Sequence, residues 1–281
     1  MNNITELINS RLAELVDKYQ VSLNLYESMK YSISAGGKRI RPAIVLSMIA
    51  DIDDSLVNKY LDLACSLEFV HTYSLIHDDL PAMDNSMYRR GKLTNHQVFG
   101  EDIAILAGDA LLTESFNIIV SSDIEDELKV KCVKSLSSLS GANGMVAGQA
   151  LDVKNVSVNS IHEIEKINYH KTHDLILCAF LFGAYALGFS DDKIKMIEDC
   201  ADSFGLSFQI KDDIDDITKT SLELGKDSQN DQQNSKMTYP HVYGLDASRK
   251  LLNTYKEKTL SIIKQLFGEN HLYKLIMGYY D

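Results

Sequence analysis

The amino-acid sequence predicts an all-α protein, a single large helical bundle around a central cavity, with residues 1–281 forming one domain. Helix breakers are few, because the 281 residues contain only three prolines and fifteen glycines. Apolar residues recur at intervals of three and four, the spacing that places them on one face of a helix. No run alternates strictly between apolar and polar residues between hairpin turns, as half-buried strands do.

Helices are expected where this apolar spacing continues, and they should break where glycine, proline or short polar runs gather. The apolar stripes cover residues 4–15, 60–76, 103–120, 125–139, 161–187 and 194–210. Pro42 suits the first turn of a further helix over residues 43–50. Breaks are expected at residues 35–37, 52–54, 84–100, 121–123, 155–160, 188–192 and 218–240.

Charge and composition exclude several classes of function. The formal net charge of −12 argues against a nucleic-acid partner, since phosphate backbones attract basic surfaces. The N-terminus lacks the pattern of a secretion signal, and the longest uncharged apolar run, residues 175–189, is too short to span a membrane. Four cysteines in apolar surroundings are expected to be buried free thiols: Cys65, Cys132, Cys178 and Cys200. We therefore expect a soluble cytoplasmic protein.

Two aspartate-rich clusters carry the strongest functional signal. They consist of Asp78, Asp79 and Asp84, and of Asp212, Asp213, Asp215 and Asp216. Both lie beside apolar, helix-like stretches, where carboxylates are costly to bury unless a cation compensates them. Mg²⁺ binds one or two carboxylates together with phosphate oxygens of a substrate. One cluster alone would indicate a solvated acidic helix end, but two favour a cavity with a metal-bridged diphosphate between opposing carboxylates.

The spacing within each cluster has geometric consequences. Pro81 should end or kink the first helix, so that Asp84 can fold back towards Asp78 instead of pointing away from it. In the second cluster Asp212 and Asp216 are four residues apart and share one helix face. A bound cation would remove the repulsion between these carboxylates.

A glycine- and cation-rich segment indicates a second anion site. Residues 36–37 are both glycine, which allows close backbone approach, and Lys38, Arg39 and Arg41 follow. A helix that begins near Pro42 adds the partial positive charge of its N-terminus. We interpret the segment as a phosphate cradle, the alternative being an ordinary basic loop.

Three residues near the first acidic cluster extend this picture. Arg89 and Arg90 follow the cluster, and they either bind phosphate or belong to a solvated loop. His71 lies seven residues before Asp78, about two helical turns, and so on the same face. A histidine in an apolar helix is by default a core residue, but here it can also be a neutral donor to a diphosphate.

Six segments together resemble the signature motifs of the short-chain trans-prenyl diphosphate synthases of the bacterial farnesyl diphosphate synthase (geranyltranstransferase) type. They are GGKRIRP, SLIHDDLPAMD followed by RRGKLTNH, AILAGDALL, GQALD, FQIKDDIDD and KMTYP. They occur in the expected order between about residue 31 and about residue 245. The four residues between Asp79 and Asp84 match the bacterial form of the first motif.

The resemblance implies an isoprenoid-synthase-like fold and a Mg²⁺-dependent prenyltransferase with three Mg²⁺ per active site. Isopentenyl diphosphate would condense head to tail with dimethylallyl or geranyl diphosphate to give farnesyl diphosphate, by ionisation, condensation and elimination. The implied partners are these diphosphate substrates and a second copy of the chain in a homodimer.

The resemblance also implies a role for each matching residue. The metal ligands would be Asp78, Asp79, Asp84, Asp212, Asp213 and Asp216. The allylic diphosphate would be bound by Arg89, Lys171, Thr172, Gln209 and Lys226. Isopentenyl diphosphate would be bound by Lys38, Arg41, His71 and Arg90. The residues implied in catalysis are Asp78, Asp84, Lys171, Thr172, Gln209 and Asp212.

Tyr73 is expected to set the product length. It lies five residues before Asp78, about 7.5 Å deeper along the same helix. In the family resembled, an aromatic residue here closes the floor of the pocket for the growing chain, which implies a C15 product. The alternative is that Tyr73 is an ordinary core residue.

The sequence departs from the family pattern at three places. His173 and Asp174 follow Thr172 where the family usually has glycine, Gln229 replaces a glycine three residues after Lys226, and residues 85–86 replace a more acidic pair. The departures at His173 and Gln229 keep open a weakly active or regulatory subunit of a synthase, although no metal-binding aspartate is lost. A class I terpene cyclase is disfavoured, because it needs no second diphosphate cradle and has a different second metal motif.

Overall fold

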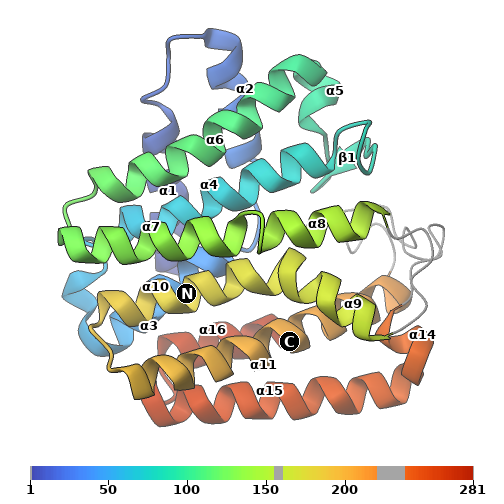
Figure 1. Cartoon of the computed structure of the whole chain (residues 1–281). Coiled ribbons are helices and arrows are strands. Elements are labelled where there is room, and N and C mark those ends of the chain that lie inside the picture. Colours follow the sequence, from blue (N-terminus) through green and yellow to red (C-terminus); the bar gives the residue numbers. More distant parts are fainter. Residues whose placement is uncertain (1, 155–160, 220–237, 281) are drawn as a thin grey trace. The chain divides into compact units, whose positions relative to one another are not determined.

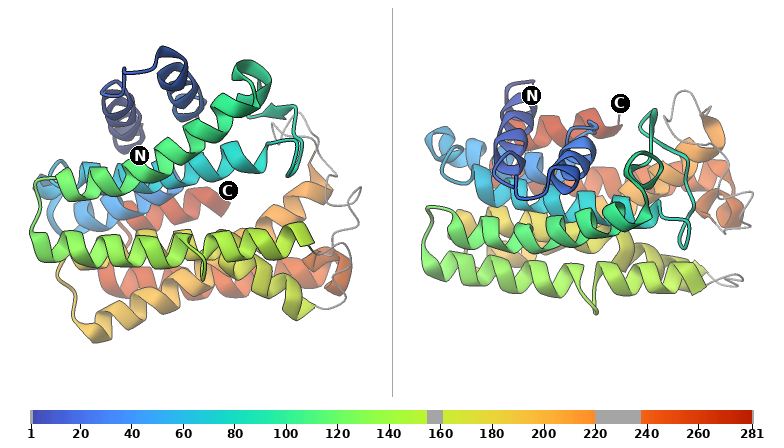
Figure 2. Two further views of the ribbon diagram at one scale, coloured as in Figure 1. Left: turned by 45° about the horizontal axis from the view of Figure 1, so that its top comes forward. Right: turned by 90° about the horizontal axis from the view of Figure 1, so that it is seen from above.

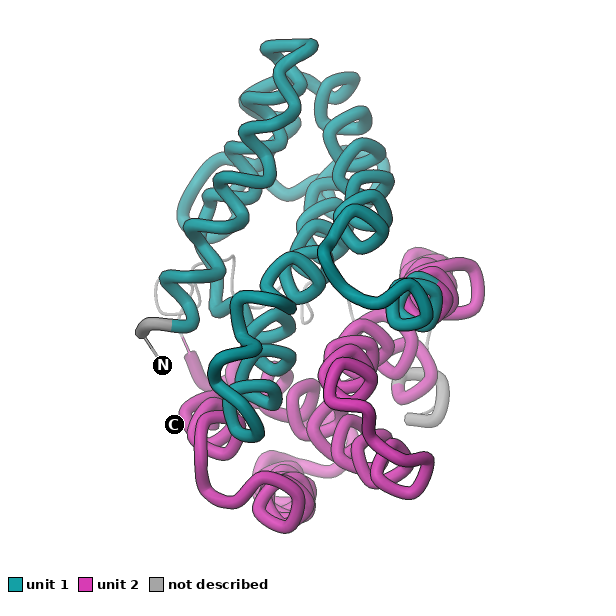
Figure 3. The backbone as a smooth tube through the Cα atoms, turned by 90° about the vertical axis from the view of Figure 1, so that its left-hand side faces the viewer, with its two compact units in different colours: residues 1–133 teal, residues 134–281 magenta. Residues whose placement is uncertain are grey.

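The computed structural model describes residues 2–154, 161–219 and 238–280, and it confirms the all-α prediction. Within these ranges the chain is helical apart from one two-stranded antiparallel hairpin. Backbone contacts group the chain into two compact units, residues 1–133 and 134–281, which are coloured separately in Figure 3. The expectation that they form one domain around a central cavity stays a prediction, and each unit is described by itself.

Unit 1 contains helices of very different length and one short hairpin. In chain order its elements are α1 (Asn2–Val16), α2 (Leu23–Ile33), α3 (Ile40–Asp53), a 3₁₀ turn η1 (Asp54–Leu56), α4 (Leu61–Asp78), β1 (Tyr88–Arg89), β2 (Lys92–Leu93), α5 (Asn95–Phe99), α6 (Glu101–Ser121) and the first part of α7 (Asp126–Ser140). In the hairpin Tyr88 pairs with Leu93 and Arg89 with Lys92.

Helix α4 is the centre of unit 1. It lies alongside α6 (Figure 1) and also packs against α1, α2 and α3. Because neighbours surround it, residues on all of its sides are buried, including Leu63, Leu67, Phe69 and Val70. This packing fixes the C-terminal end of α4, where the first aspartate cluster begins.

The start of α3 depends on a buried ion pair. Arg39 caps the helix in the left-handed backbone conformation, with φ 51°. Its Nη1 lies 2.6 Å from Oε1 of Glu68 on α4, and both side chains are 2% exposed. Removing one partner of such a pair costs about 3–5 kcal/mol, because it leaves an uncompensated buried charge. The prediction of a cradle with three cations is therefore wrong for Arg39, which belongs to the core.

Unit 2 is built around the longest helix of the described chain. Its elements are the rest of α7, α8 (Met145–Lys154), α9 (Ile161–Asn168), a π-helical turn η2 (Tyr169–His173), α10 (Asp174–Ala186), α11 (Asp191–Thr218), α14 (Tyr239–Tyr243), α15 (Leu245–Phe267) and α16 (His271–Tyr280). Helix α15 returns alongside α11 (Figure 2). Ile210 and Ile214 of α11 form a small apolar cluster with Tyr239, which fixes the end of α11 that carries the second aspartate cluster.

Most predicted helices are confirmed, with two differences. A hairpin and the short α5 occur inside the break predicted for residues 84–100, and η2 interrupts the helix predicted for residues 161–187. The break at residues 155–160, and nearly all of the break at 218–240, lie outside the described residues. All four cysteines are buried and free, as predicted.

Helix α6 also has the length and composition of a membrane span. The uncharged run identified in the sequence, residues 175–189, forms α10 and is largely buried. Of the membrane-compatible stretch in α6, 39% is buried. One such helix is weak evidence for a membrane protein, since core helices of soluble proteins have the same composition.

Candidate active site

The first aspartate cluster lies where α4 ends. Asp78 is the last residue of the helix, and the chain turns sharply before Pro81. The backbone N–H of Asp84 donates a hydrogen bond of 2.9 Å to the carbonyl of Asp78. The predicted return of Asp84 towards Asp78 is therefore confirmed, and both residues lie at one end of α4.

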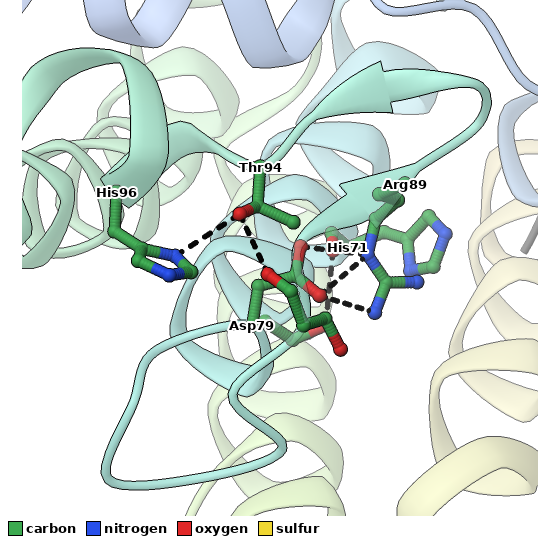
Figure 4. A network of polar contacts seen from close by, with 7 residues as sticks. His71, Asp79, Arg89, Thr94 and His96 are labelled. Carbon is green, nitrogen blue, oxygen red and sulfur yellow. Dashed lines mark hydrogen bonds and ion pairs between the residues drawn. The ribbon is translucent and has the colours of Figure 1, made fainter. Parts of the chain in front are cut away.

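The carboxylate of Asp79 is more buried than those of Asp78 and Asp84. Asp79 is buried, and both of its carboxylate oxygens accept hydrogen bonds from Arg89 on β1, at 2.7–2.9 Å (Figure 4). Burial raises the pKa of Asp79, while the Arg89 guanidinium opposes that shift. Planar bidentate pairing of this kind fixes orientation as well as charge. Asp79 thus holds the hairpin against the end of α4.

The rest of the loop is held by hydrogen bonds to its backbone. Thr94 Oγ1 donates to the carbonyl of Ser86 at 2.7 Å, and it also lies 3.2 Å from Nδ1 of His96 (Figure 4). The amide of Asn95 bonds both the hydroxyl and the carbonyl of Ser28 on α2. Hydrogen bonds to other parts of unit 1 therefore hold the segment that carries Arg89 and Arg90 in a defined conformation.

Arg90 lies directly on the glycine segment. Its guanidinium donates to the carbonyl of Gly36, and a Cβ at Gly37 would lie 2.6 Å from its Cζ. Gly37 therefore allows the close approach that was predicted for the pair, with Arg90 as the approaching group, whereas a Cβ at Gly36 would meet nothing within 4 Å. Arg90 itself has positive φ, 54°, and precedes Gly91 in the hairpin turn.

His71 of α4 belongs to the same group of residues. Burial and the positive charges of Arg41, Arg90 and Arg89 lower the pKa of His71 well below its usual value. The ring is therefore neutral near neutral pH, as the sequence suggested. Unit 1 thus gathers Arg41, His71 and Arg90 beside the glycine turn, while Lys38 lies exposed on the same segment.

The second aspartate cluster occupies the last turns of α11. Asp212 and Asp216 are one turn apart on one face. Asp213 is buried on a different face: its Oδ1 accepts from Nε2 of Gln209 at 2.8 Å and its Oδ2 from the backbone N–H of Tyr239 at 2.9 Å. Asp213 therefore holds the segment that begins at Tyr239 against α11.

Lys171 and Thr172 lie on the π turn η2, where α8 supports them. Nζ of Lys171 lies 2.7 Å from Oδ2 of Asp152. A Cβ at Gly148 would overlap the backbone of Lys171, so only glycine lets α8 come this close. Both polar atoms of the Gln149 side chain are buried and have no hydrogen-bond partner among the described residues. The GQALD motif, to which the sequence alone gave no role, thus supports Lys171.

The remaining predicted residues have simpler positions. Tyr73 is buried in α4, its ring is edge-on to His77 at 5.7 Å between centroids, and burial together with Asp78 raises its pKa to about 12. Lys226 and Gln229 lie outside the described residues. That both aspartate clusters face a common cavity concerns the arrangement of the two units, and it stays a prediction.

The oxygen donors fit Mg²⁺ only if a substrate completes the shell. No three His, Cys, Asp or Glu side chains in the described ranges are gathered closely enough to hold a metal by themselves. Mg²⁺ commonly binds through one or two carboxylates, with phosphate oxygens and water filling its octahedron. The paired aspartates at the ends of α4 and α11 match that pattern.

Comparison with known proteins identifies the class. The structure matches a geranyltransferase from Helicobacter pylori complexed with magnesium and isoprenyl diphosphate, with a TM-score of 0.86 and 30% identity over 100% of this chain and 98% of that one. Farnesyl diphosphate synthase of Micrococcus luteus is 42% identical over 98% of this chain and 94% of its own length. The large subunit 1 of a chloroplastic heterodimeric geranylgeranyl pyrophosphate synthase of Arabidopsis thaliana is 41% identical over 87% and 68%.

The fold is therefore that of the all-helical isoprenoid synthases. The sequence model of the polyprenyl synthetase family matches residues 23–269, and the chain belongs to this family of prenyltransferases. The resemblance seen in the sequence motifs is confirmed, and neither the terpene cyclase nor the weakly active or regulatory subunit is favoured.

Proposed function

We propose that this prenyltransferase condenses isopentenyl diphosphate head to tail with dimethylallyl and geranyl diphosphate, and that farnesyl diphosphate is the main product. The observation that carries the proposal is the group formed by Arg41, neutral His71 and Arg90 beside the glycine turn. It offers a diphosphate site that is distinct from the aspartate turns. An enzyme that joins two diphosphate substrates needs such a second site, whereas a cyclase does not.

Each aspartate receives a role from its contacts. Asp78 and Asp84 on unit 1, and Asp212 and Asp216 on unit 2, are the proposed metal ligands. Asp79 and Asp213 are proposed as supporting ligands, and they also orient Arg89 and anchor the segment at Tyr239. Three Mg²⁺ per active site, when bound, would neutralise the charge that develops on the departing diphosphate.

Side chains of the protein bind both substrates and surround the reacting carbon atoms. Arg89, Lys171 and Lys226 bind the allylic diphosphate, so that their fixed charges need no reorganisation when it leaves. Thr172 and Gln209 line the region of the developing carbocation, which requires the exclusion of water. Lys38, Arg41, His71 and Arg90 hold isopentenyl diphosphate close to it, and proximity lowers the barrier. The departing diphosphate accepts the proton lost in the last step.

A product assay tests the proposal. The protein is incubated with labelled isopentenyl diphosphate, Mg²⁺ and each allylic diphosphate in turn, and the products are separated by chain length. Farnesyl diphosphate should dominate with both dimethylallyl and geranyl diphosphate. A cyclic hydrocarbon, or no consumption of isopentenyl diphosphate, would refute the proposal.

Substitutions should separate the two diphosphate sites. Lys38→Ala and Arg41→Ala should raise the KM for isopentenyl diphosphate about tenfold, the effect of losing about 1.4 kcal/mol of charge-assisted binding, and change the KM for geranyl diphosphate far less. Lys226→Ala should do the reverse. Lys18→Ala removes an exposed charge elsewhere in unit 1 and is the matched control. Equal changes in both KM values would show that the sites are wrongly assigned.

A homodimer is the proposed assembly, with the open face of α6 as the contact. One side of α6 packs on α2 and α4, while Ile105, Leu106 and Val120 are 44–53% exposed. These three positions fall within about 100° around the helix axis, and the exposed residues Asp109 and Thr113 lie in the same sector, so the stripe is apolar with polar residues between its ends. A second copy would bury the stripe by presenting its own in a two-fold contact. This assignment fits a soluble cytoplasmic enzyme better than a membrane span does.

Oligomeric state tests the α6 contact. The wild type should have the mass of a dimer in light scattering after gel filtration, and Leu106→Asp should shift it to the monomer. Val130→Asp, at an exposed apolar position on α7, is the control and should remain a dimer. A dimeric Leu106→Asp variant would place the interface elsewhere.

A further inference from the structure

The turn that carries Lys171 and Thr172 has an unusual backbone. Residues Tyr169–His173 form a π-helical turn, in which the N–H of Asp174 bonds the carbonyl of Tyr169. π turns are rare, and they are found frequently at functional sites. The extra residue must be held in place by contacts outside the turn, because the wider turn packs less well than an α-helix.

The imidazole of His173 supplies such contacts. It is only 3% exposed, and its Nε2 lies 2.9 Å from Oδ1 of Asp202 on α11. Its Nδ1 lies 3.8 Å from Oδ1 of Asp174, and the ring of Tyr169 stacks on it at 4.3 Å between centroids. A Cβ at Gly205 of α11 would overlap the ring. The ring is thus wedged between η2 and α11, in space that a glycine provides.

The residues around His173 favour the protonated form of its imidazole. Burial alone would lower the pKa of His173, but the carboxylates of Asp174 and Asp202 outweigh burial and raise it. Asp174 is shared with a second imidazole, because Nδ1 of His170 lies 2.9 Å from its Oδ2.

Other charged groups come from the elements packed on this turn. Helix α8 brings Asp152, which is engaged with Lys171, and α9 carries Glu165 and Lys166 in its last turns. Helix α11 also carries Glu198, whose charge acts on Tyr169. The charged groups nearest to the His173 ring nitrogens are the carboxylates of Asp202, 2.9 Å from Nε2, and Asp174, 3.8 Å from Nδ1, and both are ion-pair contacts without hydrogen-bond geometry.

We propose that His173 is a positioning residue: in its protonated form it bridges Asp174 and Asp202 and so clamps the π turn, with Lys171 and Thr172, to α11. The role of Lys171 and Thr172 in binding the allylic diphosphate comes from the proposed function, whereas the clamp is independent of it. The large imidazole lies on the turn, and the glycine that leaves room for it, Gly205, lies on the neighbouring helix.

The sign of the pH dependence follows from the raised pKa. The clamp's contribution to stability is fully present below the unfolded-state pKa of about 6.5 and is lost as the pH rises through the higher folded-state pKa. With the clamp released, Lys171 and Thr172 lose their fixed position. The KM for the allylic diphosphate should then rise, while isopentenyl diphosphate, bound by other residues, is affected little.

Steady-state kinetics between about pH 6 and pH 9 test the clamp. For the wild type, the KM for geranyl diphosphate should rise severalfold across this range relative to that for isopentenyl diphosphate. In the His173→Gln variant, the KM for geranyl diphosphate should be high and nearly constant over the whole pH range. Asp202→Asn removes one carboxylate from the ring and should move the rise to lower pH. His271→Gln removes an exposed imidazole from α16 and is the control, which should keep the wild-type profile.

Urea unfolding over the same pH range separates the clamp from the proposed function. The unfolding free energy of the wild type should fall relative to that of His173→Gln as the pH rises, whether or not the protein turns over prenyl substrates. If His173→Gln keeps the wild-type pH profiles of both KM and unfolding, the clamp is refuted. If unfolding shows the difference and the substrates are not consumed, the clamp stands and the proposed function fails.

Discussion

Asp212→Asn and Asp78→Asn should each lower turnover by at least about 100-fold while leaving the fold intact, because each removes charge where the departing diphosphate must be neutralised. Both residues lie at helix ends and are not fully buried, so the loss of one carboxylate should cost little stability. Turnover is measured at saturating substrate and Mg²⁺, and circular dichroism checks the helix content.

The controls use carboxylates of the same helix. Asp192→Asn, in the exposed first turn of α11, should retain wild-type turnover. Asp213→Asn makes a sharper comparison: it weakens the anchor of Tyr239, so it should lower thermal stability as well as activity. If Asp212→Asn turned over normally at saturating Mg²⁺, the assignment of metal ligands on α11 would have to be abandoned.

Tyr73→Ala should change the product from C15 to longer chains. The relatives include both farnesyl and geranylgeranyl diphosphate synthases at nearly equal identity, so overall similarity does not select the length. A closely packed aromatic ring leaves no space for one more isoprene unit, and its removal would open space below Asp78. Chromatography of products from geranyl diphosphate and excess isopentenyl diphosphate measures the change.

Loss of a buried aromatic side chain also destabilises the protein, by about 3 kcal/mol or more. Tyr60→Ala is the matched control, because Tyr60 is a similarly buried tyrosine at the other end of α4. It should lower stability and leave the product length unchanged. A folded, active Tyr73→Ala enzyme that still stopped at C15 would move the floor of the pocket to other residues.

Local rules were sufficient for the parts of the site that depend on near neighbours in the chain. Pro81 predicted the turn that returns Asp84 to Asp78, and the four-residue spacing of Asp212 and Asp216 predicted their common face. Glycine at positions 36–37 predicted a close approach. Each of these inferences needs only backbone geometry within a few residues.

The parts that failed depend on partners far away in the chain. The sequence groups Arg39 with Lys38 and Arg41 because Glu68, which pairs with it in the core, lies 29 residues away. The anchoring contact of Asp213 could not be predicted either, because its donor at Tyr239 lies 26 residues away. The π turn was invisible, since the apolar spacing of residues 161–187 continues across it.

The buried Arg39–Glu68 pair restricts how the glycine segment can change in evolution. Because Arg39 must enter the core in a left-handed conformation, the positions of Lys38 and Arg41 on either side of it are fixed in register. Inserting or deleting one residue between Gly37 and Pro42 would displace Arg39 and leave the Glu68 carboxylate buried without a counter-charge. This segment should therefore tolerate exchange of its exposed side chains but no change in length, in contrast to ordinary surface loops.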